Sequence, residues 1–167
     1  MNNTVEMNET LIRKMLAYYS GDPARIQHYT KVYTYASMIG HAEHLSDELQ
    51  HILETAAILH DIGIKIAEEK YHCSTGPLQE KEGPSIVRTF LADSGMTEAQ
   101  VERIAYLVGH HHTLTGIDGM DYQILIEADY LVNASEKTYS PANVQNFMNT
   151  SMKTESGKKL AKALFRL

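Results

Sequence analysis

Five histidines and two aspartates in this chain are of the residue types that bind transition metals. They are His28, the adjacent pair His60 and Asp61, the run His110, His111 and His112, and Asp129. The helical pattern of the sequence places these four sets on four different elements. A metal held between helices takes side chains from several of them, which converge on one point inside the bundle. The distribution therefore predicts a metal centre.

The pair His60 and Asp61 follows the apolar run "AAIL" in the stretch "AAILHDIGIK". A charged pair on the inward face of a helix is costly to bury unless a positive charge meets it, and a divalent cation would supply that charge. The alternative is a polar helix end that faces water.

Consecutive helical residues point about 100° apart, so the three histidines of "GHHHT" cannot all face the same way. The apolar stripe through Ile104 and Val108 leads on to His111 and His112, whereas His110 points outward. The alternative is a helix C-terminus, where the helix dipole favours histidine. For His28 the alternative is a packing or surface histidine.

Asp129 stands in the mostly apolar stretch "ILIEADYLV". An unpaired carboxylate in such surroundings would lose its charge, and a metal would keep it ionised. A salt bridge to a lysine, or a cap on a neighbouring helix, would do the same.

These residues must be positioned by helices, because helical spacing recurs along the chain and strand-like alternation is almost absent. We expect an all-α fold of about seven to eight helices in a single domain, with its core at about residues 22–137 and helices 140–166 packed on it. One helix should end at His60 and Asp61, the segment 72–77 should be a loop, and the next helix should cover about 79–93.

Composition narrows the classes of partner. The net charge of −6 leaves no basic stripe for general nucleic-acid binding, and no apolar run reaches the ~20 residues that cross a bilayer. One cysteine, Cys73, and an N-terminus without a signal peptide predict a cytoplasmic protein. An exposed face of Leu160, Leu164 and Phe165 would allow a homodimer.

The order His28, His60-Asp61 and Asp129, with the contexts "AAILHDIG" and "EADYLV", resembles the HD superfamily of metal-dependent phosphohydrolases. The resemblance covers about residues 22–137, and the chain looks like a small bacterial single-domain member. It implies a bundle of at least five helices in which His28, His60, Asp61 and Asp129 bind a first metal.

Some branches of this superfamily hold a second metal, with the HD aspartate as the bridge. By this resemblance, His111 and His112 match a paired histidine of those branches. The apolar stripe of the helix at 79–93 runs back to Glu80 of "LQEKEGP", which is the expected further ligand, whereas Glu82 points more to the side and would support a ligand. The chain has "HDIGIK" rather than "HDIGK" and lacks "GYP", so cleavage of cyclic dinucleotides is not implied.

Imidazole and carboxylate ligands suit one or two ions of Mn, Fe, Co, Ni or Zn. Such an ion activates water for attack on phosphorus. Asp61 would take the proton or bridge the metals, and Lys65 or His110 would neutralise the phosphate, although Lys65 could equally be a solvated lysine. We expect a small phosphorylated substrate, a nucleotide above all.

Two other functions stay open from the sequence. A few HD proteins use a six-ligand di-iron site to activate dioxygen, which would make this chain an oxygenase. A non-catalytic HD module that senses a ligand would be expected to lose one or more metal ligands, and the ligand set here is intact.

Overall fold

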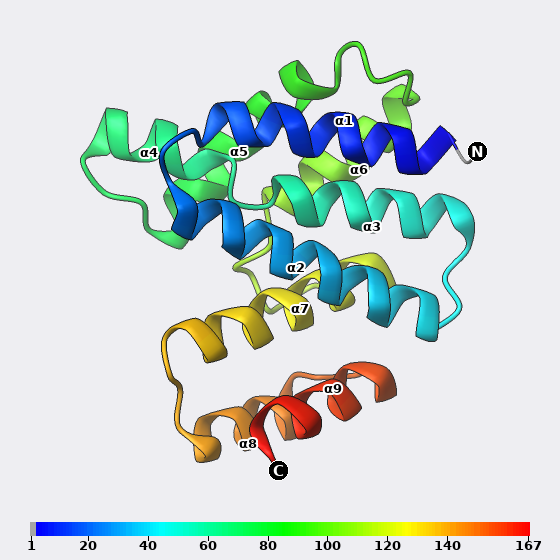
Figure 1. The fold of residues 1–167 in the computed structure, drawn as a ribbon, viewed down its shortest axis with the longest axis vertical. Coiled ribbons are helices and arrows are strands. Elements are labelled where there is room, and N and C mark those ends of the chain that lie inside the picture. Colours follow the sequence, from blue (N-terminus) through cyan, green and yellow to red (C-terminus); the bar gives the residue numbers. More distant parts are fainter. Residues whose placement is uncertain (1–2) are drawn as a thin grey trace.

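The computed structural model describes residues 3–167, with side chains from residue 5, and this part of the chain is helical without a strand (Figure 1). Its nine helices are α1 Asn3–Tyr18, α2 Pro23–Ala42, α3 Asp47–Leu59, α4 Gly63–Tyr71, α5 Gly76–Leu91, α6 Glu98–Val108, α7 Met120–Glu136, α8 Pro141–Thr150 and α9 Glu155–Phe165. The all-α prediction is confirmed. None of the described helices is both long and apolar enough to cross a membrane.

Local capping interactions fix where several helices begin. The Asp22 side chain accepts a hydrogen bond from the backbone N–H of Arg25, next to a proline in the first turn of α2. Thr97 and Gln100 form a reciprocal capping box at the start of α6. Each cap satisfies backbone donors that have no partner inside the helix, so these starts can be read from sequence.

Helices α2, α3 and α7 contact one another and form the centre of the bundle (Figure 1). Residues 50–59 of α3 are all buried, and so is most of α7, including Asp129. Because both helices are covered on nearly all sides, polar groups on them must find partners inside the protein.

The segment after α3 differs from the sequence expectation. Helix α3 ends at Leu59, and residues 60–62 form a turn that leads directly into α4, so the bundle has a helix more than expected. Helix α5 begins at Gly76 rather than at about residue 79. The short α4 was missed because it has nine residues and no side-chain cap at its start.

Gly63 is needed where α4 crosses α5. A Cβ at this position would lie 2.5 Å from the carbonyl oxygen of Gln79, closer than real atoms approach, and 3.0 Å from the backbone nitrogen of Gly83. The absence of a side chain therefore lets the two backbones touch. This contact brings Gln79 close to the 60–62 turn.

Helices α8 and α9 lie beside α7 at the C-terminal end of the chain (Figure 1). Phe147 and Ala161 belong to the same buried hydrophobic cluster as the central helices. The expected apolar face on α9 is only partly open, because Leu160 and Phe165 pack against that cluster and Leu164 is exposed. The structure thus leaves a smaller dimer surface than the sequence indicated.

Candidate metal centre

Four of the expected ligands meet at one point between α2, α7 and the 60–62 turn. The His28 Nε2 atom lies 3.1 Å from Asp129 Oδ1 and 3.4 Å from Asp61 Oδ2. The His60 Nε2 atom lies 3.4 Å from each of the same two oxygens. His60 is fully buried, and Asp129 is 7% exposed. Residues separated by a hundred positions in the sequence are thus brought into one cluster.

Three histidines of the site are each braced through the ring nitrogen that faces away from it. His60 Nδ1 lies 2.8 Å from the carbonyl oxygen of Ala57, and His111 Nδ1 lies 2.8 Å from that of Val108. His28 Nδ1 lies 2.8 Å from a carboxylate oxygen of Glu136. These oxygens only accept, so each Nδ1 carries the hydrogen and each neutral ring presents an Nε2 lone pair to the site.

With their hydrogens on Nδ1, the histidine rings turn Nε2 lone pairs toward each other and toward the carboxylate oxygens, so hydrogen-bond acceptors face one another. The Nε2 atoms of His28 and His60 are 3.2 Å apart, and both face the carboxylates of Asp61 and Asp129. The buried His111 Nε2 makes no hydrogen bond with any described residue. Lone pairs and carboxylates packed in this way need a positive charge among them, which protons or a metal cation would provide.

The spacing fits a metal. Ligand atoms about 2.1 Å from a common ion lie about 3.0–3.4 Å from one another in octahedral or tetrahedral geometry. The separations among the ligand atoms of His28, His60, Asp61 and Asp129 run from 3.1 to 3.4 Å. The mixed nitrogen and oxygen donors suit a first-row transition metal better than Mg²⁺ or Ca²⁺. The residues present therefore fit the ion that the sequence predicts.

The electrostatics favour positive charge at this point. Burial alone would lower the pKa of His60, but the neighbouring Asp61 and Asp129 carboxylates outweigh burial and hold that pKa well above its usual value. Burial would raise the pKa of Asp61 and Asp129, and the histidines outweigh it and lower both. The carboxylates therefore stay ionised and attract a cation.

A second group of ligand atoms shares Asp61 with the first. Asp61 with His111 and His112 forms one set whose ligand atoms lie within 4.8 Å of one another, and Asp61 with His28 and His60 forms another. Asp61 Oδ2 faces the pair His28 and His60, while its Oδ1 lies 3.4 Å from His111 Nε2. One carboxylate with its two oxygens turned to different groups has the arrangement of a bridging ligand.

His112 is held by Gln79 on α5. The side-chain nitrogen of Gln79 donates to the carbonyl oxygen of Ser74 at 2.7 Å, so its oxygen is the atom that faces His112 Nε2 at 2.8 Å. His112 Nε2 therefore carries a hydrogen, and its lone pair is on Nδ1. Burial and the neighbouring His111 lower the pKa of His112 to about 4, which keeps the ring neutral and able to bind a metal.

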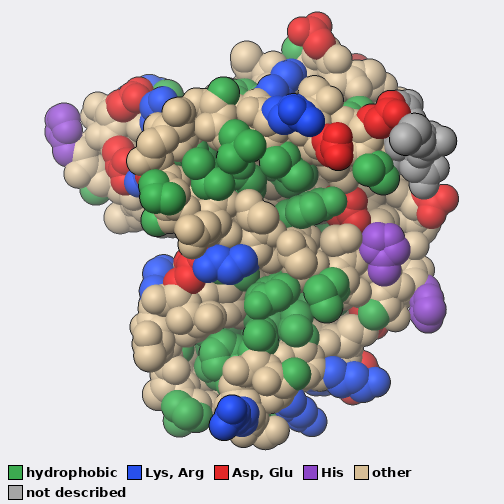
Figure 2. Space-filling view, viewed as in Figure 1, with side chains coloured by type: hydrophobic (Ala, Val, Ile, Leu, Met, Phe, Trp, Pro, Cys, Tyr) green, Lys and Arg blue, Asp and Glu red, His purple; other side chains and the backbone are tan. Residues whose placement is uncertain are grey.

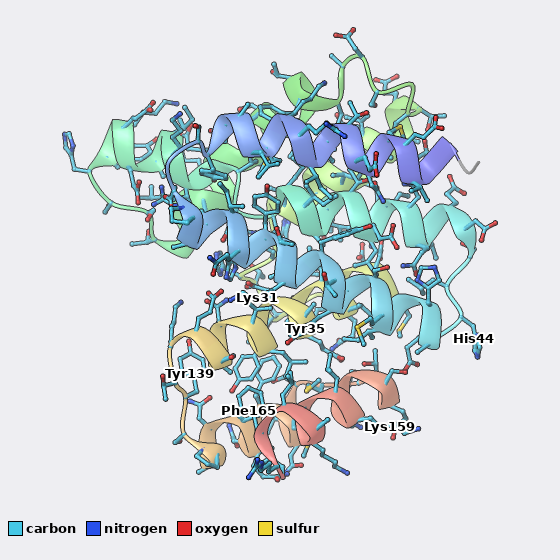
Figure 3. All side chains as sticks on the ribbon, viewed as in Figure 1. Lys31, Tyr35, His44, Tyr139, Lys159 and Phe165 are labelled. Atoms are coloured by element: carbon cyan, nitrogen blue, oxygen red, sulfur yellow. The ribbon has the colours of Figure 1, made fainter. Side chains whose placement is uncertain are left out.

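These groups line a cavity of about 460 Å³ that opens to the surface. Figure 2 shows a notch in the outline between α4 and the C-terminal end of α7, the elements that flank this cavity. Two cationic side chains, Arg25 and Lys137, line it together with the aromatic rings of Tyr130, Tyr139 and Phe147. Figure 3 shows Tyr139 near the end of α7 and Lys31 above it on α2.

The structure revises the expectation for Glu80 and Glu82. Glu80 Oε1 accepts hydrogen bonds from the backbone N–H of His112 at 3.0 Å and from the Thr113 hydroxyl at 2.9 Å, and it is in neither ligand group. It holds the turn that carries the histidines and does not face the cluster. Glu82 pairs instead with Lys70 at 2.6 Å, away from the cavity. Helix α5 begins earlier than expected, so Gln79 faces the site in their place.

Lys65 and His110 are also placed differently from the expectation that they neutralise phosphate. The Lys65 amine lies 4.9 Å from the ring centre of Tyr18 and does not line the cavity. His110 stacks on Tyr106, with ring centres 4.1 Å apart, and it too lies outside the cavity lining. Lys65 is the third residue of α4, and this helix turns its side chain toward α1.

The sequence reading missed several polar residues around the site. Asn133 donates to Asp129 Oδ1 at 2.8 Å, and Glu136 braces His28. Both follow Asp129 on α7 at spacings of four and seven residues, which place them on the same helix face. That periodicity was a usable signal. The roles of Arg25 and Gln79 depend on packing between helices and left no such signal.

Comparison with known proteins decides the family. The HD domain model matches residues 25–141, more than half of the chain. The chain belongs to the HD family. Comparison with curated proteins and with solved structures found no match. The matched segment contains every residue of the two ligand groups, from His28 to His112, and Asp129 as well.

Membership of the HD family identifies the general class of chemistry. HD domains bind divalent metals and form a superfamily of metal-dependent phosphohydrolases. The family match begins after α1 and ends at the first residue of α8, so the helices at both ends of the chain lie outside it.

Proposed function

We propose that this HD protein hydrolyses a phosphate ester with one or two divalent transition-metal ions held by His28, His60, Asp61 and Asp129 on one side and by Asp61, His111 and His112 on the other. The observation that carries the proposal is the convergence of unpaired imidazole lone pairs and ionised carboxylates on the wall of an open cavity. A structural metal site would be closed to solvent, whereas a catalytic one keeps a position for water and substrate.

In this proposal the ion, when bound, lowers the pKa of a water molecule toward ~7 and polarises a phosphoryl oxygen. Asp61 orients that water, because it is the residue common to both ligand groups. The water would lose a proton as its oxygen forms the new bond to phosphorus, the ester P–O bond would break, and the departing oxygen would take up a proton in exchange. The braced rings of His28 and His60 keep the ligand atoms in place throughout.

Two cations support a phosphate-bearing substrate. Lys137 lines the cavity and forms no ion pair with the described residues, so its charge is available to a phosphate. Arg25 lines the same cavity and is already engaged by Asp22 and Glu68. We assign the larger share of phosphate binding to Lys137, in place of the lysine that the sequence suggested.

The aromatic wall supports a planar group on the substrate. Tyr130 and Phe147 stack with ring centres 3.5 Å apart, and Tyr139 lines the same wall of the cavity. Planar rings bind other planar rings by offset stacking and by excluding water. A nucleotide combines such a ring with a phosphate, so we propose a nucleotide or a similar small phosphorylated metabolite as the substrate.

The test is a phosphate-release screen of nucleotides and sugar phosphates with metal-stripped protein reloaded with Mn²⁺, Co²⁺, Ni²⁺, Zn²⁺ or Fe²⁺. Release that is abolished in His60→Ala and unchanged in His44→Asn, an exposed turn residue (Figure 3), is the expected result. Iron-loaded protein that consumes oxygen and releases no phosphate would instead support the oxygenase. Metal binding without either reaction would support a sensing module.

A further inference from the structure

Helix α1 lies outside the family match, yet its last turn contacts the backbone next to the metal ligands. The Tyr19 hydroxyl, just after α1, donates to the carbonyl oxygen of Asp61 at 2.8 Å. The Tyr18 hydroxyl donates to the carbonyl oxygen of Ile62 at 3.2 Å. Two adjacent tyrosines therefore hold two adjacent carbonyls of the 60–62 turn.

Both rings are fixed by packing. Tyr19 is 3% exposed, and its ring meets that of Tyr18 edge to face with centres 4.9 Å apart. Tyr18 in turn packs edge to face on Phe90 of α5, at 5.3 Å. The helix that carries them is anchored in the core by Met15, which is fully buried. The hydroxyl groups are thus held at positions set by the core rather than by solvent.

Lys65 completes this contact. Its amine lies over the Tyr18 ring and donates to the carbonyl oxygen of Tyr18 at 3.4 Å. A cation above an aromatic face is attracted to it, so Lys65 links the start of α4 back to the end of α1. The conspicuous lysine after "HDIGI" therefore contributes to a helix contact outside the cavity.

The turn needs such support because it is not part of a helix. Between α3 and α4 its backbone is held by the Ile62 N–H on Leu59 and the Ile64 N–H on Asp61, at 2.9 and 3.0 Å. Asp61 is the residue common to both ligand groups, so a rotation of its backbone would move ligand atoms in both. The direction of the Asp61 carboxylate depends on how firmly this turn is held.

We propose that Tyr18 and Tyr19 are positioning residues of the metal centre, which hold the 60–62 turn so that both carboxylate oxygens of Asp61 face their ligand groups. The proposal rests on the metal centre proposed above. The 110–113 turn, which carries the other histidine ligands, is also held by a tyrosine hydroxyl. The Tyr122 hydroxyl lies 2.8 and 2.7 Å from the carbonyl oxygens of His110 and Thr113 and shares its one hydrogen between them, so it holds the segment that carries His111 and His112.

The variant Tyr19→Phe removes the hydroxyl and keeps the packed ring. It should fold, because the Asp61 carbonyl keeps its bond from the Ile64 N–H and no buried acceptor is left without a partner. The matched control is Tyr29→Phe, because Tyr29 is 1% exposed and its hydroxyl makes no hydrogen bond with the described residues.

The measurement is calorimetric titration of each metal-stripped protein with Co²⁺, together with thermal unfolding with and without Co²⁺. We expect Tyr19→Phe to bind Co²⁺ roughly tenfold more weakly than wild type and Tyr18→Phe roughly threefold more weakly, with the control unchanged. The stabilisation by Co²⁺ should shrink in the same order.

A merely structural role gives a different result. It would lower the unfolding temperature of metal-free Tyr19→Phe and leave Co²⁺ affinity at the wild-type value, which would overturn the positioning role alone. Wild-type protein that binds no Co²⁺ would overturn the metal centre and the positioning role with it. If Tyr19→Phe does not fold, the Co²⁺ affinity of Tyr18→Phe decides between the two roles.

Discussion

The two ligand groups that share Asp61 are built differently. In the first group, His28 and His60 lie within 3.4 Å of both carboxylates, and each ring is braced by a hydrogen bond at 2.8 Å. In the second group, His111 and His112 are also braced at 2.8 Å, but His112 is exposed at the cavity wall, and Asp61 is the one carboxylate of this group. The first group is therefore the more completely organised before any ion arrives.

This difference in organisation predicts which of the two ligand groups should bind its ion more tightly. Ligands that are already oriented and desolvated lose little freedom on binding, so their affinity for a metal is higher. We therefore expect a tight ion between His28, His60 and Asp129, and a weaker one at His111 and His112. The bridging Asp61 should couple the two.

The largest expected effect is the loss of a ligand from the first group. When metal-stripped His60→Ala is titrated with Co²⁺, the first group should bind its ion more weakly by about 100-fold or more, because one nitrogen that contacts the metal directly is gone. His112→Ala should keep the tight ion within about threefold and lose the weak one. If both variants lost the same affinity for Co²⁺ in both binding steps, the two groups would act as one unit and the difference between them would be refuted.

The brace on His28 should have the next largest effect. In Glu136→Gln the side chain keeps its size and loses the charge that orients His28, so the tight ion should bind about tenfold more weakly. The matched variant is Lys31→Met, which removes the other partner of Glu136, 2.6 Å away, and should change affinity less than about threefold. A stronger effect of Lys31→Met would assign the bracing to the ion pair rather than to the carboxylate.

The contact on His112 should affect only the weaker ion. Gln79→Met removes the acceptor for His112 Nε2 and fills a similar volume, so the second Co²⁺ should bind about fivefold more weakly while the first is unchanged. The two binding steps of one calorimetric titration give both values. A change in the first step would mean that Gln79 supports the whole site.

The smallest effect is expected for the lysine that the sequence singled out. Lys65→Met should leave the KM for a substrate found in the phosphate-release screen within about twofold, because its amine lies over Tyr18 and not in the cavity. Lys137→Met should raise the same KM about fivefold. If Lys65→Met raised the KM more than Lys137→Met did, Lys65 would be the lysine that binds the phosphate.

The helical fold could be predicted because its signals are local. The caps at Asp22 and Thr97 and the apolar stripe of each helix depend on residues within one or two turns. The short α4 was missed because no side-chain cap marks its start after the 60–62 turn. That turn is shaped by the close contact of Gly63 with α5, which no local pattern reveals.

The ligand set was easier to predict than its surroundings. His28, His60, Asp61, Asp129, His111 and His112 do converge. His28 and Asp129 stand on the inward faces of α2 and α7, and the other four lie in the turns that follow α3 and α6. Glu80 was placed by extending the apolar stripe of α5 backward, and it binds the backbone of the 110–113 turn instead. The choice between Glu80 and Gln79 depends on how α5 crosses α4, a tertiary contact.

The most direct test of the metal centre is elemental analysis of protein purified without added metal, and again after incubation with excess Co²⁺ and removal of the free ion. We predict at least one transition-metal ion per chain as purified and two after incubation, with His44→Asn unchanged. No bound metal under either condition would contradict the account, because protons alone would then balance the carboxylates at the 60–62 turn.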